Sequence, residues 1–183
     1  FGGKILAARN CHLAFLNACI LLDWQPCWLC PPYDGESGLA RTVTAADVAA
    51  AMDADPGVRS VYLTSPDYYG AAADIAAIAG EVHARGGLLL IDNAHGAHLR
   101  FLSEDRHPMT MGADLCCDSA HKTLPVLTGG GYLHSAGKVP KEQLKADMAL
   151  FGSTSPSYLI LASLDLCNRW LAGPAREEFA RMA

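Results

Sequence analysis

The alternation of short apolar runs with helical patterns is the feature that most restricts how this chain can fold. The runs at 4–8, 58–64, 88–92 and 113–118 are rich in apolar residues and show little polar alternation. Strands read this way when both of their faces are buried, whereas a strand with one face in water alternates apolar and polar residues. Because helical patterns separate the runs, we expect an α/β fold with three layers, α/β/α, around a mostly parallel sheet.

Capping and turn signals set the expected limits of the elements. Thr44 with Asp47 three residues later is a variant of a capping box, and Pro56 with Gly57 ends that helix. Gly86-Gly87 follows an alanine-rich helical pattern and ends it. We expect strands at 4–8, 26–30, 58–64, 88–92, 113–118 and 131–134, and helices at 12–22, 44–55, 71–85, 140–150 and 156–172.

Length and charge limit the classes of protein and of partner. A chain of 183 residues with 51% hydrophobic content can bury a sizeable core, so we expect one domain over residues 1–183. The net charge of −5 and the scattered lysines and arginines speak against a nucleic-acid partner. No apolar run approaches the roughly 20 residues that span a bilayer, and the start lacks the pattern of a signal peptide. We therefore expect a cytoplasmic protein with no membrane partner, and reduced thiols at its seven cysteines.

A lysine follows one of the expected strands in a setting that favours imine chemistry. Lys122 lies in Ser119-Ala120-His121-Lys122-Thr123, directly after the apolar run that ends at Asp118. An ordinary surface lysine is the alternative, but burial beside the strand would lower the lysine pKa and leave the neutral amine that imine formation needs. The context favours a lysine that carries a carbonyl cofactor.

An aspartate at the end of another expected strand completes a candidate cofactor site. Asp92 follows Leu88-Leu89-Leu90-Ile91, about thirty residues before Lys122. The carboxyl ends of parallel strands meet at one edge of a sheet, where ligands bind. A lysine that forms a Schiff base and an aspartate that pairs with a pyridinium nitrogen are the two groups that pyridoxal phosphate (PLP) requires. We therefore predict a PLP site at this edge.

Two metal interpretations are weaker. Asp92, His95 and His98 are three apart, but catalytic zinc patterns place such histidines on a helix with a further ligand, so we expect no metal. We expect His98 to be structural and His95 to lie near the cofactor phenolic oxygen or the substrate carboxylate. Cys27 and Cys30 lack a second C-x-x-C and fall in a strand-like run, where residues three apart face opposite sides.

Several segments together resemble the major domain of the Orn/Lys/Arg decarboxylase family, PLP enzymes of the aspartate aminotransferase fold (fold type I). The resemblance covers most of the chain. Its carriers are Arg9-Asn10-Cys11-His12, Thr64-Ser65-Pro66-Asp67-Tyr68-Tyr69-Gly70, Ile91 to His98, Ser119 to Pro125, and Ser153-Thr154-Ser155-Pro156-Ser157-Tyr158.

The resemblance assigns roles to individual residues. It implies that Lys122 forms the Schiff base, that Asp92 pairs with the pyridinium, and that His12 and Ala94 pack on the two ring faces. His12 is also counted, with Lys122, among the catalytic residues. The remaining implied contacts are Ser119 and His121 with the phosphate, His95 as a catalytic residue near the ring, and Thr154 at the cofactor of a neighbouring subunit. This last contact implies a homodimer whose sites lie at the interface.

The resemblance implies decarboxylation of a small-molecule substrate, namely arginine, lysine or ornithine, with release of carbon dioxide. Another fold-type-I enzyme, such as an aminotransferase or lyase, and a non-catalytic remnant are the alternatives. Asn93 departs from the family, which commonly has an acidic residue there. A Gly/Ser/Thr-rich phosphate-binding turn before Phe1 and a small domain after Ala183 are also lacking, so we expect a partial domain.

Overall fold

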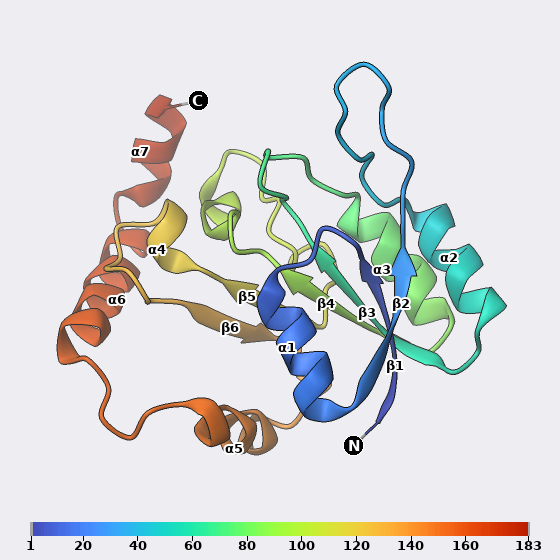
Figure 1. Cartoon of the computed structure of the whole chain (residues 1–183). Coiled ribbons are helices and arrows are strands. Elements are labelled where there is room, and N and C mark those ends of the chain that lie inside the picture. Colours follow the sequence, from blue (N-terminus) through green and yellow to red (C-terminus); the bar gives the residue numbers. More distant parts are fainter. Residues whose placement is uncertain (1, 183) are drawn as a thin grey trace.

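A six-stranded sheet forms the centre of the protein (Figure 1). The structure is a computed structural model that describes residues 2–182; Phe1 and Ala183, the limits of the expected domain, lie outside them. The strand order is β2-β1-β3-β4-β5-β6, with β6 antiparallel to β5 and the other neighbours parallel. The strands are β1 (Gly3–Ala8), β2 (Trp24–Leu29), β3 (Val58–Thr64), β4 (Leu88–Asp92), β5 (Leu115–Asp118) and β6 (Tyr132–Ser135).

Helices cover both faces of the sheet, so the chain has the three-layer α/β/α arrangement expected of it. Helix α1 lies on one face, and α2 and α3 lie on the other (Figure 1). The helices are α1 (Leu13–Leu22), α2 (Ala45–Ala54), α3 (Ile75–Ala84), the 3₁₀ helix η1 (Ala97–Phe101), α4 (Ala120–Thr123), α5 (Lys141–Phe151), α6 (Tyr158–Leu171) and α7 (Ala175–Met182).

The main core lies between the sheet and helices α2 and α3. Val48 of α2 and Ile78 of α3 are fully buried against Val61 and Leu89 of the central strands. Burying an aliphatic side chain of this size stabilises a fold by about 1.5–3 kcal/mol. A smaller cluster joins Phe15 of α1 to Ile5 and Ala7 of β1 on the opposite face. Both faces of the central strands are therefore apolar, which explains why these runs lack alternation.

Most expected elements are present within a few residues of their predicted limits. The capping box of α2 is confirmed, with Thr44 Oγ1 accepting a bond from the Asp47 amide at 3.2 Å. The helix predicted from residue 71 begins at Ile75, because Asp74 caps it by accepting from the amide of Ala77 at 3.0 Å. The sequence did not predict η1, α4 or α7, which have 5, 4 and 8 residues and are too short to show a clear period.

The register of the sheet places the polar strand ends side by side. Thr64 of β3 pairs with Asp92 of β4, and Asp92 pairs with Cys117 of β5. The turn after Asp92 and the turn after Asp118 therefore leave the sheet at the same edge. This edge carries the residues from which the sequence predicted a site.

Two further observations concern the cysteines and the apolar character of the helices. The seven cysteines are free thiols. Among residues 2–182, none of the helices has both the length and the apolar character to cross a membrane.

Candidate functional site

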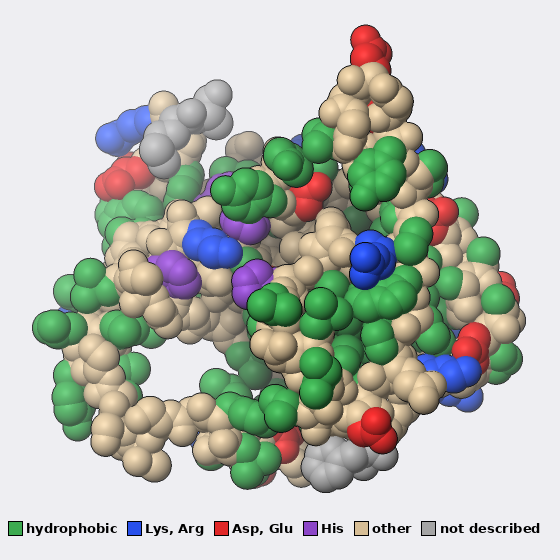
Figure 2. Space-filling model, in the orientation of Figure 1, with side chains coloured by type: hydrophobic (Ala, Val, Ile, Leu, Met, Phe, Trp, Pro, Cys, Tyr) green, Lys and Arg blue, Asp and Glu red, His purple; other side chains and the backbone are tan. Residues whose placement is uncertain are grey.

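Lys122 and His95 meet above the carboxyl edge of the sheet. Lys122 lies in α4, His95 lies in the turn after β4, and Lys122 Nζ is 3.4 Å from His95 Nε2. The ring of Tyr68 packs edge-on against the His95 ring, with 5.7 Å between centroids. Histidine and basic side chains gather beside hydrophobic ones on this face (Figure 2). The structure thus brings two of the predicted residues into direct contact.

Asp92 is oriented by a residue that the sequence analysis did not single out. Its Oδ2 accepts a hydrogen bond from the hydroxyl of Tyr62 at 2.9 Å, and its Oδ1 accepts one from the amide of Ala94 at 3.2 Å. Tyr62 in turn stacks on Phe15 of α1, with 4.3 Å between ring centroids. Burial, and then the charge of Asp92, raise the pKa of Tyr62, which keeps its hydroxyl protonated and donating. Asp92 therefore faces the α1 side of the sheet.

The prediction that Lys122 is buried is wrong for this chain. Its side chain is exposed, although the neighbouring Ala120 is fully buried. Strand β5 ends four residues earlier, at Asp118, and the intervening turn of α4 directs Ala120 inward and Lys122 outward. The apolar run that suggested burial therefore stops before the lysine.

The other predicted contacts lie around this pair or apart from it. His12 caps α1, where its Nδ1 accepts from the amide of Ala14 at 3.1 Å, and its ring is exposed. Ala94 is half-buried in the turn after β4, and Ser119 starts α4 with a hydroxyl that makes no capping bond. Thr154 is exposed in the segment between α5 and α6, which Figure 1 shows away from α4. Thr154 is thus separate from Lys122 within one chain.

His121 is fixed by the glycine-rich turn before β6. Its Nδ1 lies 2.8 Å from the carbonyl oxygen of Gly130, so this nitrogen carries a proton and donates. The other ring nitrogen, Nε2, is then a lone pair in neutral His121 and a donor only in the imidazolium. A phosphate group would accordingly be bound by the charged form of His121.

Three buried polar atoms of the turn after β4 and of α4 lack a hydrogen-bond partner among residues 2–182. They are Asn93 Oδ1, His95 Nδ1 and Thr123 Oγ1. A buried polar atom without a partner costs about 1–3 kcal/mol. Because Lys122 Nζ is a donor, His95 Nε2 accepts from it and His95 Nδ1 carries the proton. This leaves a buried, unmatched N–H donor on the imidazole ring that contacts the lysine.

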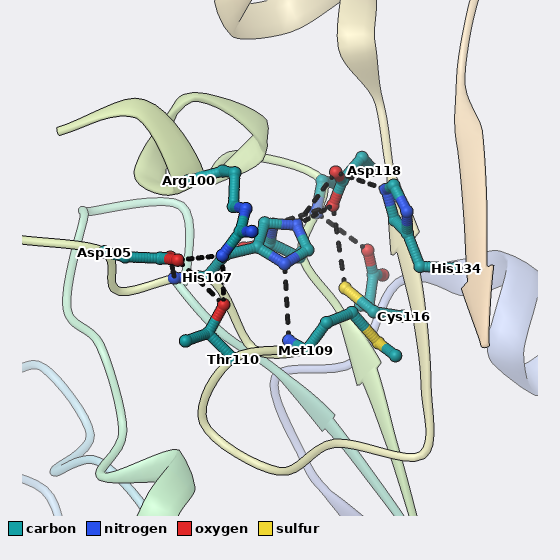
Figure 3. A network of polar contacts seen from close by, with 11 residues as sticks. Arg100, Asp105, His107, Met109, Thr110, Cys116, Asp118 and His134 are labelled. Carbon is teal, nitrogen blue, oxygen red and sulfur yellow. Dashed lines mark hydrogen bonds and ion pairs between the residues drawn. The ribbon is translucent and has the colours of Figure 1, made fainter. Parts of the chain in front are cut away.

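A second polar network lies behind this edge, around Asp118 (Figure 3). Asp118 Oδ2 is 3.0 Å from His107 Nε2 and 2.9 Å from His134 Nε2, while Oδ1 accepts from Asn93 Nδ2 at 2.7 Å. Burial raises the pKa of Asp118, but the bonds from His107, His134 and Asn93 outweigh it and hold that pKa well below the usual range. Asp118 is therefore a buried carboxylate. No motif in the sequence connected these four residues.

The ligand atoms of His107, Asp118 and His134 lie within 4.8 Å of one another, close enough to share a metal ion. The amide of Met109, however, donates to His107 Nδ1 at 3.3 Å. His107 then carries its proton on Nε2 and donates it to Asp118, so it offers no lone pair to an ion. Hydrogen bonding accounts for this cluster. It also differs from the Asp92, His95 and His98 set weighed from the sequence, which forms no such group among residues 2–182.

Two cavities flank the edge. One of about 280 Å³ is lined by residues of the segments that carry the resemblance, namely Arg9, Asn10, Thr64, Asp67 and Tyr69, together with the 38–43 loop. The other, of about 400 Å³, opens on the Asp118 network and includes Arg100, Tyr132 and His134. Lys122 lines neither cavity. Its side chain is exposed, in the short helix α4 that follows β5.

Comparison with known proteins supports the resemblance. Residues 1–181 match the family described as Orn/Lys/Arg decarboxylase, major domain. The chain is 37% identical over 175 residues to uncharacterized protein YaaO of Bacillus subtilis, covering 93% of this chain and 36% of that protein. It is 32% identical over 178 residues to arginine decarboxylase of the same organism, covering 96% and 36%.

The fold agrees with solved structures of related enzymes. The lysine decarboxylase LdcF of Francisella novicida superposes with a TM-score of 0.79 at 24% identity, over 92% of this chain and 25% of that one. The chain spans about a third of the length of the curated relatives it matches. By its sequence match and its fold, the chain belongs to the Orn/Lys/Arg decarboxylase family.

Proposed function

We propose that this chain forms the PLP-binding domain of a decarboxylase that acts on a basic amino acid, with Lys122 as the residue that carries the cofactor. The observation that supports this most directly is the contact of 3.4 Å between Lys122 Nζ and His95 Nε2 at the strand edge that also carries Asp92. Family membership and the arginine and lysine decarboxylases among the relatives support the substrate class.

The residues present suit the chemistry of PLP. The unmatched atoms His95 Nδ1 and Thr123 Oγ1 flank Lys122 and would bind polar groups. Asp92, held by Tyr62, would pair with the pyridine nitrogen, and His12 and Ala94 would contact the ring. Ser119 and protonated His121 would hold the phosphate, because hydrogen bonds from charged donors to anions are the stronger class.

The chain's own groups would prepare the lysine and orient the substrate. His95 Nε2 accepts a hydrogen bond from Lys122 Nζ, which would hold the amine at the strand edge that carries Asp92. The Nδ1–H group of His95 would donate to a carboxylate or phenolic oxygen. When bound, PLP supplies an electron sink for the charge left on the substrate α-carbon as carbon dioxide departs.

Covalent labelling of Lys122 tests the proposal. PLP is added to the purified chain, the product is reduced with borohydride, and the modified peptide is located by mass spectrometry. We expect the label on Lys122, its loss in Lys122→Ala, and its retention in Lys145→Ala, which removes an exposed lysine of α5. Label spread over several surface lysines, or the same yield in Lys122→Ala, would contradict the proposal.

The reaction is tested by its products. Arginine, lysine and ornithine are each supplied to the PLP-treated protein, and carbon dioxide and amine are measured beside the keto acid. We expect carbon dioxide and the corresponding amine from one or more of the three. A keto acid without carbon dioxide would indicate an aminotransferase.

We also propose a homodimer in which Thr154 approaches the cofactor of the other subunit. Thr154 lies outside the Lys122 site of its own chain, in a segment flanked by exposed apolar side chains. These are Leu150, Phe151, Tyr158 and Leu159. A second copy would cover them.

A further inference from the structure

We propose that Asp118 is a positioning residue that fixes the orientation of Asp92 from the opposite face of the sheet. Asp92 and Asn93 are adjacent, and each is bonded by a different partner: Asp92 by Tyr62, and Asn93 by Asp118 (Figure 3 shows the network around Asp118). We call the hydrogen bond between Asn93 and Asp118 the anchor. Its role in the reaction rests on the proposed function, since it is Asp92 that would pair with the cofactor.

The alternation of side chains along a strand places the two partners on opposite faces. Tyr62 packs with Phe15 on the α1 face. Cys116, two residues before Asp118, is buried in the core formed with α2 and α3, so Asp118 continues on that face. The turn after β4 is therefore bonded from both sides of the sheet at consecutive residues.

The anchor is buried, and the surrounding turn leaves the Asn93 side chain little room to rotate. Asn93 has no exposed surface, and Asp118 is 6% exposed. The amide of Asn93 donates to the carbonyl of Cys117 at 2.9 Å, and its carbonyl accepts from the amide of Gly96, also at 2.9 Å. A Cβ atom on Gly96 would lie 2.0 Å from Asn93 Oδ1, so the turn closes tightly over the side chain. Rotation of Asn93 would break the bond to Asp118 or collide with this turn.

His107 and His134 keep Asp118 in place for Asn93. They occupy its Oδ2 at 3.0 and 2.9 Å, while Asn93 holds Oδ1. The Cys116 thiol, 3.6 Å from Oδ1, is a weaker donor. A carboxylate held by these donors cannot turn away without leaving a buried charge unmatched, which is costly. The position of Asp118 is thus set by His107 and His134, and its bond to Asn93 extends this constraint to the residue that directly follows Asp92.

Hydrogen exchange in the absence of PLP tests the anchor directly. Asp118→Asn removes the charge while keeping the shape, and it is compared with Asp114→Asn. Asp114 is a matched control, since it is 2% exposed, is bonded to His83 at 2.9 Å, and lies just before the opposite end of β5. At equal global stability, set with urea, we expect Asp118→Asn to speed exchange at the amides of Ala94 and Gly96 about tenfold, a fold-change typical of a lost hydrogen bond to a charged group. Asp114→Asn should leave those amides unchanged.

A second variant covers the case in which Asp118→Asn fails to fold. Asn93→Ala removes the same contact from the other partner and keeps the Asp118 charge with its two histidines. It should also speed exchange at Ala94 and Gly96. Equal exchange in the anchor variants and in Asp114→Asn would overturn the proposal.

A cofactor readout then connects the anchor to Asp92. If PLP labels Lys122 in the parent protein, the pH midpoint of the bound cofactor's absorbance should shift in Asp118→Asn and not in Asp114→Asn. Faster exchange with an unshifted midpoint would overturn the claim that the anchor acts on Asp92. If the parent protein takes up no PLP on Lys122, the proposed function fails, while the exchange experiment still decides whether Asp118 holds the turn.

Discussion

The hydroxyl group of Tyr62 orients the carboxylate of Asp92 by donating a hydrogen bond to it. The bond from Tyr62 to Asp92 Oδ2 is 2.9 Å long, and the Tyr62 ring is separately held by stacking on Phe15. The stacking does not depend on the hydroxyl. The two contributions can therefore be separated by substitution.

We expect Tyr62→Phe to keep the fold and lower the free energy of unfolding by about 1–2 kcal/mol, because the ring stays stacked while Asp92 loses a donor. Urea unfolding at pH 7 measures this change. Tyr62→Ala, which also removes the ring, should cost about 3–5 kcal/mol. Equal stability of Tyr62→Phe and the parent protein would show that the hydroxyl bond contributes nothing.

Sequence reasoning found those site residues that follow a strand directly. Asp92 was identified because it ends an apolar run, and His95 because it shares that motif. Tyr62 was missed because an aromatic residue inside a strand is indistinguishable from a core residue. The exposure of Lys122 was mispredicted because it depends on how a four-residue helix turns after β5. The Asp118 network unites residues up to 41 positions apart, from Asn93 to His134, which no local pattern indicates.

At the scale of elements, Asp114 joins helix α3 to the start of β5. Its carboxylate accepts bonds from His83 of α3 at 2.9 Å and from the amide of Leu89 at 2.8 Å, and Lys138 Nζ lies 2.6 Å away. Burial raises the pKa of Asp114, but the bonds from Lys138, Leu89 and His83 lower it below its ordinary value of 3.8. Its folded pKa is thus below its unfolded pKa.

Because the pKa of Asp114 is lower in the folded chain than in the unfolded chain, its contribution to the free energy of unfolding depends on pH. The unfolded chain binds a proton at Asp114 near pH 4, whereas the folded chain binds it only at lower pH, so the stabilisation is present above about pH 4 and is lost as the pH falls. We expect Asp114→Asn to lower the free energy of unfolding by about 2 kcal/mol at pH 7 and by much less at pH 3. Urea unfolding across this range measures the difference.

Asp53→Asn is the control, because Asp53 is exposed and pairs with Arg85 on the surface. Exposed pairs contribute about 0–1 kcal/mol. A cost for Asp114→Asn that is as large at pH 3 as at pH 7 would contradict the pKa assignment.

Most of the long elements were predictable because the central strands carry apolar residues on both faces and the helices carry clear caps. Thr44, Pro56 and Gly57 limited α2 correctly, and Gly86 with Gly87 limited α3. The start of α3 was misplaced since alanines at 71–73 have high helix propensity but precede the Asp74 cap. Tertiary context decided which alanines joined the helix.

At the scale of the whole molecule, the segment from α5 to α6 exposes a group of apolar side chains. Leu150, Phe151, Tyr158 and Leu159 are each more than 70% exposed. Groups of exposed apolar side chains are common at interaction sites. A second copy of the chain is the occupant that the proposed function requires.

We expect the parent protein to sediment as a dimer, and Phe151→Asp with Leu159→Asp to sediment as a monomer with unchanged secondary structure. Analytical ultracentrifugation and circular dichroism measure the two properties. Lys145→Glu, a charge change at an exposed position of α5, should leave the dimer intact. A monomeric parent protein, or a double variant that remains dimeric, would contradict this interface.

Successive residues at the end of β4 point to opposite faces of the sheet, and this alternation limits which mutations the site can tolerate. Asp92 and Asn93 reach opposite faces only because each occupies its own place in a two-residue repeat. Inserting or deleting one codon between Leu88 and Asn93 would exchange the two faces, sending the carboxylate toward Asp118 and the amide toward Tyr62. Point substitutions in this strand change one contact at a time. A change in the length of β4 should therefore disrupt the site more than the substitution of any single apolar residue in the strand.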